Sequence, residues 1–163
     1  MSRVVLRISG RADAEETILI HTVFRMYSRY AESLGWKMES KATDESGDGL
    51  HKEVVAEISG ENVYSKLKFE SGVHRVQWLP PMERQGRVFT SKLLVTVVPE
   101  SAAPDGTGAS VGSKTIRTYN IPLDQLTDHR IGLTFHELHL VLDGKLDPII
   151  QALADRDGGA ADA

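Results

Sequence analysis

The feature that most constrains the fold of this chain is a long run of apolar residues with helical spacing. These residues recur at intervals of three or four: Leu19, Val23, Met26, Tyr30 and Leu34. The spacing predicts a helix over residues 13–34 with one broad buried face. Asp13 followed three residues later by Glu16 is typical of a helix start, and Gly35 is suited to end the helix. A helix with so wide an apolar face needs a second layer to cover it.

Segments of alternating apolar and polar residues supply strands for that layer. The expected strands cover residues 3–8, 36–40, 54–58, 63–69, 76–79 and 87–98. The last four pair as two hairpins, and the tip of the second hairpin lies at residues 80–86, which include two consecutive prolines. The strands are therefore expected to form a sheet against the long helix.

Residues 99–114 divide the chain. This stretch holds two prolines, three glycines and three serines but almost no bulky apolar side chain, so it is predicted to be a flexible linker. It separates a first domain, residues 1–98, from a C-terminal segment, residues 115–155, that is expected to pack on it. The Gly-, Ala- and Asp-rich residues 156–163 are predicted to be a disordered tail.

The C-terminal segment shows a short extended piece and then helical spacing. One helix is expected over residues 132–142, and another begins at Asp147 with Pro148 at its first position. The predicted fold class is therefore α+β. A mainly antiparallel sheet packs on one long helix, with a small C-terminal helical lobe at one end.

Composition excludes several classes of function. The 163 residues include no cysteine, which rules out disulfides, thiol catalysis and cysteine-ligated metal sites. A net charge of −4 argues against a basic coat for nucleic acid, although a local basic surface is compatible with it. No signal peptide and no apolar run long enough to span a bilayer are visible. A cytoplasmic protein without a membrane partner is expected.

No motif for catalysis, metal or cofactor binding is evident. His136 and His139 are three residues apart, whereas the zinc motif HExxH places its histidines four apart. The preferred interpretation is that both histidines lie on an exposed helix face. No glycine-flanked serine nucleophile is present either. Neither an enzyme active site nor a bound cofactor is expected.

The hairpin at residues 71–91 has a composition suited to unpaired RNA. Its arginines, Arg75, Arg84 and Arg87, can contact phosphates. Trp78 and Phe89 offer rings for stacking, and Gln77 and Thr90 can hydrogen-bond to base edges. The alternative interpretation is a solvated hairpin whose prolines form its turn.

At this hairpin the chain resembles the class I bacterial peptide chain release factors that read the codons UAA and UAG. Further stretches resemble the same family in order: residues 24–32, 67–72, 116–120 and 127–131. Together the similar stretches extend over nearly the whole chain, from residue 3 to about residue 155. The resemblance implies a codon-recognition superdomain that occupies the ribosomal decoding site. The implied partners are the small ribosomal subunit and messenger RNA.

The resemblance also implies roles for individual positions. The codon-contacting set comprises Glu15, Gln77, Pro80, Pro81, Met82, Phe89 and Thr90. Gln77 and Thr90 match the residues that read the third base, and Glu15 matches a residue near the first. The Pro80-Pro81-Met82 run stands where the family has Pro-x-Thr, and Phe89 stands where the family has a histidine that stacks on the second base.

Several departures from the family pattern bear on function. The family's catalytic domain, with its Gly-Gly-Gln loop, lies between segments that match residues near 98 and 116, and no Gly-Gly-Gln occurs in this chain. The family's N-terminal helical domain also has no counterpart. Met82 lacks the hydroxyl that would pair with the first bases, and Phe89 can stack but not donate a hydrogen bond. Residues 12 and 13 replace a glycine pair at the helix start.

Three functions are compatible with these features. The leading one is a release-factor-like protein that binds the decoding site and recognises a stop or stop-like codon without hydrolysing peptidyl-tRNA. The second is a peptidyl-tRNA hydrolase that works alone or through a Gly-Gly-Gln protein in trans. The third is a protein-binding module that has lost codon reading. A full-length release factor is a further expected partner in the first case.

Overall fold

The structure, a computed structural model, describes residues 2–11, 13–45, 51–102 and 114–162. Most of the stretch predicted to be a linker, residues 103–113, lies outside the described residues. None of the helices within the described ranges combines the length and the apolar character needed to cross a membrane.

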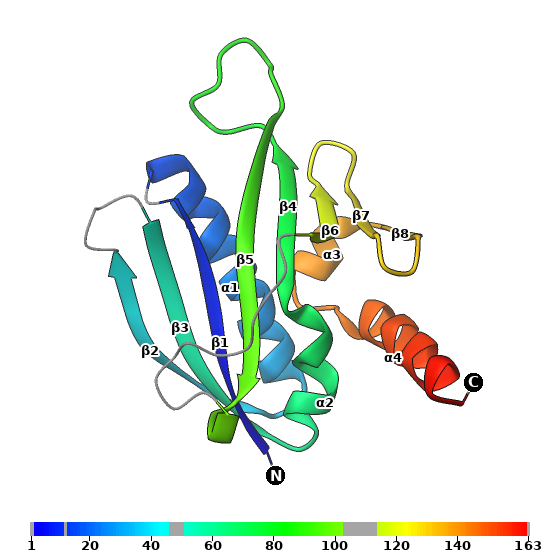
Figure 1. Ribbon diagram of the computed structural model, residues 1–163. Coiled ribbons are helices and arrows are strands. Elements are labelled where there is room, and N and C mark those ends of the chain that lie inside the picture. Colours follow the sequence, from blue (N-terminus) through cyan, green and yellow to red (C-terminus); the bar gives the residue numbers. More distant parts are fainter. Residues whose placement is uncertain (1, 12, 46–50, 103–113, 163) are drawn as a thin grey trace.

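One eight-stranded sheet runs through the molecule (Figure 1). Its strands follow the order β2-β3-β1-β5-β4-β6-β7-β8. Their bounds are β1 (Ser2–Arg11), β2 (Lys37–Glu45), β3 (His51–Gly60), β4 (Gly72–Trp78), β5 (Phe89–Pro99), β6 (Thr115–Asn120), β7 (Gln125–Asp128) and β8 (Leu133–His136). All neighbouring strands are antiparallel except β4 and β6, which are parallel.

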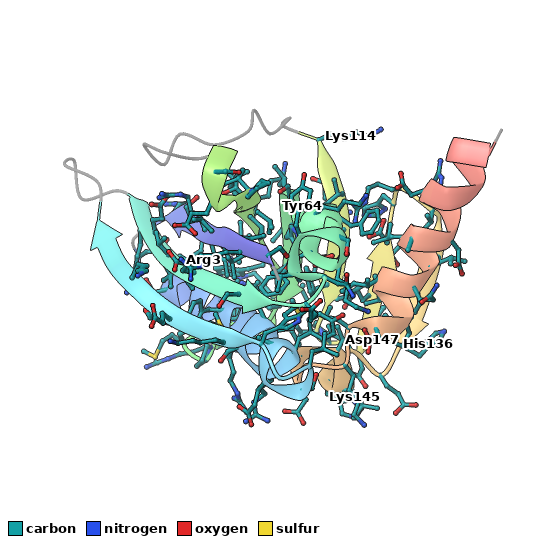
Figure 2. All side chains as sticks on the ribbon, turned by 90° about the horizontal axis from the view of Figure 1, so that it is seen from below. Arg3, Tyr64, Lys114, His136, Lys145 and Asp147 are labelled. Carbon is teal, nitrogen blue, oxygen red and sulfur yellow. The ribbon has the colours of Figure 1, made fainter. Side chains whose placement is uncertain are left out.

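In the described ranges four α-helices accompany the sheet, together with two single 3₁₀ turns, η1 (Lys68–Glu70) and η2 (Glu100–Ala102). The helices are α1 (Ala14–Ser33), α2 (Val63–Leu67), α3 (Leu138–Leu142) and α4 (Asp147–Asp162). Helix α1 covers one face of the sheet, and α4 lies towards the β8 edge (Figures 1 and 2). The predicted α+β class, with a mainly antiparallel sheet on one long helix, is confirmed.

Helix α1 forms as its spacing predicts. Its N-cap is Asp13, whose Oδ1 accepts a hydrogen bond from the backbone N–H of Glu16 at 2.7 Å. The Glu16 carboxylate in turn accepts from the backbone N–H of Arg11 at 2.8 Å. The apolar face of the helix is buried against the sheet: Leu19, Ile20, Val23, Met26, Tyr27, Tyr30 and Ala31. Each large apolar side chain there contributes about 1.5–3 kcal/mol to stability.

The structure corrects three sequence predictions. Residues 63–69 form α2 and η1 rather than a strand, because Val63 and Leu67 are one helical turn apart and both are buried. Residues 133–136 form β8 rather than the start of a helix, and only Leu138–Leu142 is helical. Helix α4 continues to Asp162, beyond the predicted start of the tail at residue 156, although Gly158 and Gly159 disfavour helix.

A buried ionic network joins the parts of the chain that precede and follow residues 103–113. Arg117 of β6 donates two hydrogen bonds to the Glu70 carboxylate, at 2.6 and 2.9 Å, and one to Asp128 at 3.2 Å. All three side chains are fully buried. The Tyr27 hydroxyl of α1 donates to Glu70 at 2.8 Å. Although burial opposes the charged form, the Arg117 guanidinium holds the pKa of Glu70 below its usual range.

His74 of β4 lies within the same network and is neutral. Its Nε2–H donates to the carbonyl oxygen of Glu70 at 2.8 Å, so its Nδ1 accepts from the Tyr119 hydroxyl at 2.7 Å. Burial and, after it, the nearby Arg117 charge lower the pKa of His74 to about 4. The segments before residue 103 and after residue 113 therefore share one sheet and one core.

Candidate nucleic-acid interface

The β4–β5 hairpin projects beyond the neighbouring strands and ends in the tip formed by residues 79–88 (Figure 1). Pro80 begins a turn in which its carbonyl oxygen accepts from the backbone N–H of Glu83 at 3.0 Å. The Glu83 carboxylate accepts from the backbone N–H of Gln85 at 2.7 Å, and it lies 3.3 Å from Arg87 Nη2. These contacts brace the tip. Pro80 itself is buried, whereas Pro81 and Met82 are exposed.

Gln77 and Thr90, the pair expected to read the third base, are direct cross-strand partners. They lie where the hairpin leaves the sheet, so their side chains share one face. Gln77 is half-buried, and its Oε1 accepts from Asn120 Nδ2 of β6 at 3.1 Å. This bond orients the Gln77 amide, while Thr90 is exposed beside it. The hairpin therefore presents an amide and a hydroxyl side by side.

Phe89 lies on the opposite face of the hairpin because successive side chains of a strand alternate. It pairs with Trp78 across the strands and is 37% exposed. Trp78 was expected to offer a stacking ring, but it is only 5% exposed and belongs to the core, where its Nε1–H donates to Ser91 Oγ at 3.2 Å. Trp78 therefore follows the buried alternation of His74 and Val76, and Phe89 is the accessible ring.

A pocket of about 470 Å³ separates the start of α1 from the beginning of β5. It brings Glu15 together with Phe89 and Thr90, although 73 residues or more separate Glu15 from them in the sequence. Its lining comprises Arg11, Asp13, Glu15, Glu16, Trp78, Phe89, Thr90, Ser91 and Lys92. The sequence analysis did not assign Arg11, Glu16, Ser91 or Lys92 to a site. The pairing of β1 with β5 and the docking of α1 bring them together.

The pocket combines charges of both signs. Arg11 and Lys92 supply cations, and three carboxylates come from the first turn of α1. Burial raises the pKa of Glu16, which is only 5% exposed. The lining thus offers hydrogen-bond donors, acceptors and one accessible ring, but neither histidine nor cysteine. Such a surface can recognise a planar polar group.

The three arginines expected to contact phosphates do not lie together. Arg84 and Arg87 are exposed on the tip. Arg75 lies on the face of the sheet opposite α1, where its Nε–H donates to Thr118 Oγ1 at 3.0 Å. The structure therefore divides them between the tip and the sheet.

The two histidines that the sequence analysis rejected as a metal site, His136 and His139, also lie in different elements. His136 lies in β8, not on a helix face as predicted, and His139 of α3 is exposed with its Nδ1 at 2.7 Å from Asp124 Oδ2. Within the ranges that the structure describes, no three His, Cys, Asp or Glu side chains gather as a metal site would require.

Comparison with known proteins identifies relatives over most of this chain. The PCRF domain family matches residues 2–95. Peptide chain release factor 1 of Acidobacterium capsulatum is 34% identical over 92% of this chain and 65% of its own length. The same factor of Bacillus subtilis is 32% identical over 94% of this chain and 67% of its own length. RF2 of Thermus thermophilus has the same fold, with a TM-score of 0.80, 21% identity and coverage of 97% of this chain and 69% of that one.

The chain spans about two thirds of the length of these curated relatives. The alignment with the Acidobacterium capsulatum factor extends over 233 residues, whereas this chain has 163, so at least 70 residues of that relative have no counterpart here. The similarity nevertheless covers both sides of the connection between β5 and β6. The chain therefore belongs to the family of peptide chain release factors that carry the PCRF domain.

Proposed function

We propose that this protein binds the decoding site of the ribosome and contacts a stop or stop-like codon, but does not itself hydrolyse peptidyl-tRNA. The observation that carries the proposal is the placement of Gln77 and Thr90 side by side at the base of a projecting hairpin, next to a pocket that holds Glu15 and Phe89. Hydrogen-bonding groups beside an accessible ring are what recognition of unpaired RNA bases requires. The protein would act in the cytoplasm, on messenger-bound ribosomes.

In this proposal the three bases meet different parts of the hairpin. The first and second bases lie on the pocket side, near Glu15 and the Phe89 ring. The third base would meet Gln77 and Thr90, and Thr90 also belongs to the lining of the pocket.

Recognition of the first two bases is expected to be weaker than recognition of the third. Met82 is 73% exposed at the tip, and its thioether is only a weak acceptor. Phe89 supplies stacking alone. A missing hydrogen bond costs about 1 kcal/mol of discrimination. We therefore expect stringent recognition of the third base and relaxed recognition of the first two.

The proposed lack of hydrolysis rests on the connection between β5 and β6. Only residues 100–114 join these strands, and no Gly-Gly-Gln occurs in the sequence. A protein of this kind would compete with a full-length release factor for the decoding site or work beside a separate Gly-Gly-Gln protein. In either case it acts on termination by occupying the codon.

One observation favours a second candidate function, a protein-binding module that has lost codon reading. Four large apolar side chains are exposed on or beside the hairpin tip: Leu79, Met82, Val88 and Phe89. Exposed apolar patches often mark protein interfaces. The pocket with its charged lining and the oriented Gln77 amide support the codon-binding function instead.

Ribosome binding tests the proposal directly. Purified protein is titrated against ribosomes whose decoding site holds a stop codon, a sense codon or no codon, and the bound fraction is measured by cosedimentation. We expect preferential binding to the stop-programmed ribosomes. Gln77→Ala and Thr90→Ala should each weaken that binding about fivefold, as loss of one hydrogen bond predicts. Gln151→Ala, on the exposed face of α4, is the matched control.

Two other outcomes of the binding experiment would contradict the proposal. Equal affinity for all three ribosome preparations would remove codon reading from the proposal, and protein that stays in the supernatant would favour the protein-binding module. A release assay with the purified chain alone should yield no free peptide. Added to a full-length release factor, the chain should slow release at its own binding concentration.

A further inference from the structure

The face of the sheet opposite α1, here called the outer face, carries a row of polar side chains that continues from Gln77 and Thr90. Strand register makes each member the direct neighbour of the next: Thr90, Gln77, Asn120, Gln125 and His136. The row crosses β5, β4, β6, β7 and β8 in spatial order. The bond from Asn120 Nδ2 to Gln77 Oε1 joins its members across β4 and β6. The row presents amides, a hydroxyl and an imidazole, all of which can form hydrogen bonds with base edges.

A second row lies two residues further along the strands. Its members are also register neighbours: Lys92, Arg75, Thr118, Thr127 and Thr134. Lys92 and Arg75 stand directly opposite each other, and like charges in that position destabilise a sheet unless an anion lies between them. His129 Nε2 adds a polar group 2.7 Å from Thr118 Oγ1. The second row is thus cationic at one end and rich in hydroxyls at the other.

Several groups in these rows are available to a ligand. Arg75 uses its Nε for Thr118, which leaves both Nη groups without a partner among the described residues. The side-chain amide of half-buried Gln125 and the ring of exposed His136 likewise have no hydrogen-bond partner within the described ranges. Cations beside base-reading amides are the combination that single-stranded RNA requires, with phosphates on one row and bases on the other.

We propose that the outer face binds unpaired messenger RNA immediately 3′ of the codon, so that Gln125 contacts a nucleotide beyond the third base. This inference rests on the proposed function. The direction follows from the order of the contacts. The proposed function places the first base near Glu15 and the third base at Thr90 and Gln77, and from there the row continues through Asn120 to Gln125. Continuity with the codon surface and the Arg75–Lys92 charge favour RNA over a protein partner.

The test compares two messengers that place the same stop codon in the decoding site. One ends at the third base of the codon, and the other continues for several unpaired nucleotides. The wild-type chain should bind ribosomes with the extended messenger several times more tightly. Gln125→Ala should weaken that binding about fivefold, as loss of one hydrogen bond predicts, and should leave binding to the truncated messenger unchanged. Gln125→Glu, which repels phosphate, should weaken it further.

Each outcome has a distinct meaning. Gln151→Ala controls for loss of a glutamine elsewhere, and unchanged tryptophan fluorescence establishes that the variants fold. If stop-codon preference persists but messenger length and Gln125 make no difference, the inference is overturned while the proposed function stands. If Gln125→Ala weakens both complexes equally, the contact is with ribosomal RNA and the messenger assignment is wrong. If no stop-dependent binding is seen, the proposed function and this inference both fail.

Discussion

Replacing Arg117 by methionine should destabilise this protein more than any surface substitution. In the native protein the guanidinium donates hydrogen bonds to Glu70 at 2.6 and 2.9 Å and to Asp128 at 3.2 Å, with all three side chains fully buried. Arg117→Met leaves the Glu70 carboxylate buried with the Tyr27 hydroxyl as its one remaining side-chain donor among the residues that the structure describes. Asp128 keeps its bonds to Arg130.

The expected cost follows from the unpaired charge. Removing one partner of a buried pair costs about 3–5 kcal/mol, which is a large part of the roughly 5–15 kcal/mol that stabilises a typical domain. With a urea m-value of about 2 kcal/mol/M, the unfolding midpoint should fall by roughly 2 M. Trp36 and Trp78 are both buried, so their fluorescence reports unfolding.

Two further variants test whether the buried charges are coupled. Arg29→Met removes a half-exposed pair with Asp143 at 2.7 Å and should cost no more than about 1 kcal/mol. Adding Glu70→Leu to Arg117→Met removes the unpaired carboxylate, so the double variant should be no less stable than Arg117→Met alone. A cost of under about 1 kcal/mol for Arg117→Met, or full additivity in the double variant, would show that the buried charges are not coupled as described.

Three other outcomes are expected. The pKa of His74 is lowered to about 4, so the stability that depends on neutral His74 is complete above its unfolded pKa of about 6.5. That stability should decrease by roughly 3 kcal/mol as the pH falls to about 4, and His74→Gln should remove this slope from melting temperatures measured against pH. Met82→Thr should tighten binding to stop-programmed ribosomes about fivefold, and unchanged affinity would exclude a base contact at that position. Gly60→Ala should lower the melting temperature, because a Cβ there would lie 2.2 Å from Trp36 Cδ1.

Local periodicity was sufficient to predict part of this fold. The helix over residues 14–33 and the hairpin formed by β4 and β5 both follow from spacing between near neighbours. Residues 63–69 show where such spacing misleads. Val63, Leu67 and Phe69 fit an alternating strand, but Val63 and Leu67 also fit one helical turn, and only the packing against the sheet decides between them.

Contacts between distant segments could not be predicted in this way. Strand β4 pairs in parallel with β6, although β5 and residues 100–114 lie between them in the sequence. No local sequence pattern predicts this pairing. Glu70 and Arg117 are 47 residues apart, and charged residues are ordinarily expected at the surface. Within the site, the register of Gln77 with Thr90 could be inferred from the hairpin, whereas the pocket beside Glu15 depends on the docking of α1.

The parallel pairing of β4 with β6 makes the connection between β5 and β6 a suitable point for the insertion of a domain. Strand β5 ends and β6 begins at the same end of the sheet, away from the hairpin tip, with only β4 between them. Two strand spacings amount to about 10 Å, a gap that a short peptide or a whole domain can bridge, because lengthening such a loop adds little entropy cost. A domain can therefore be inserted or removed at this point without altering the register of any strand.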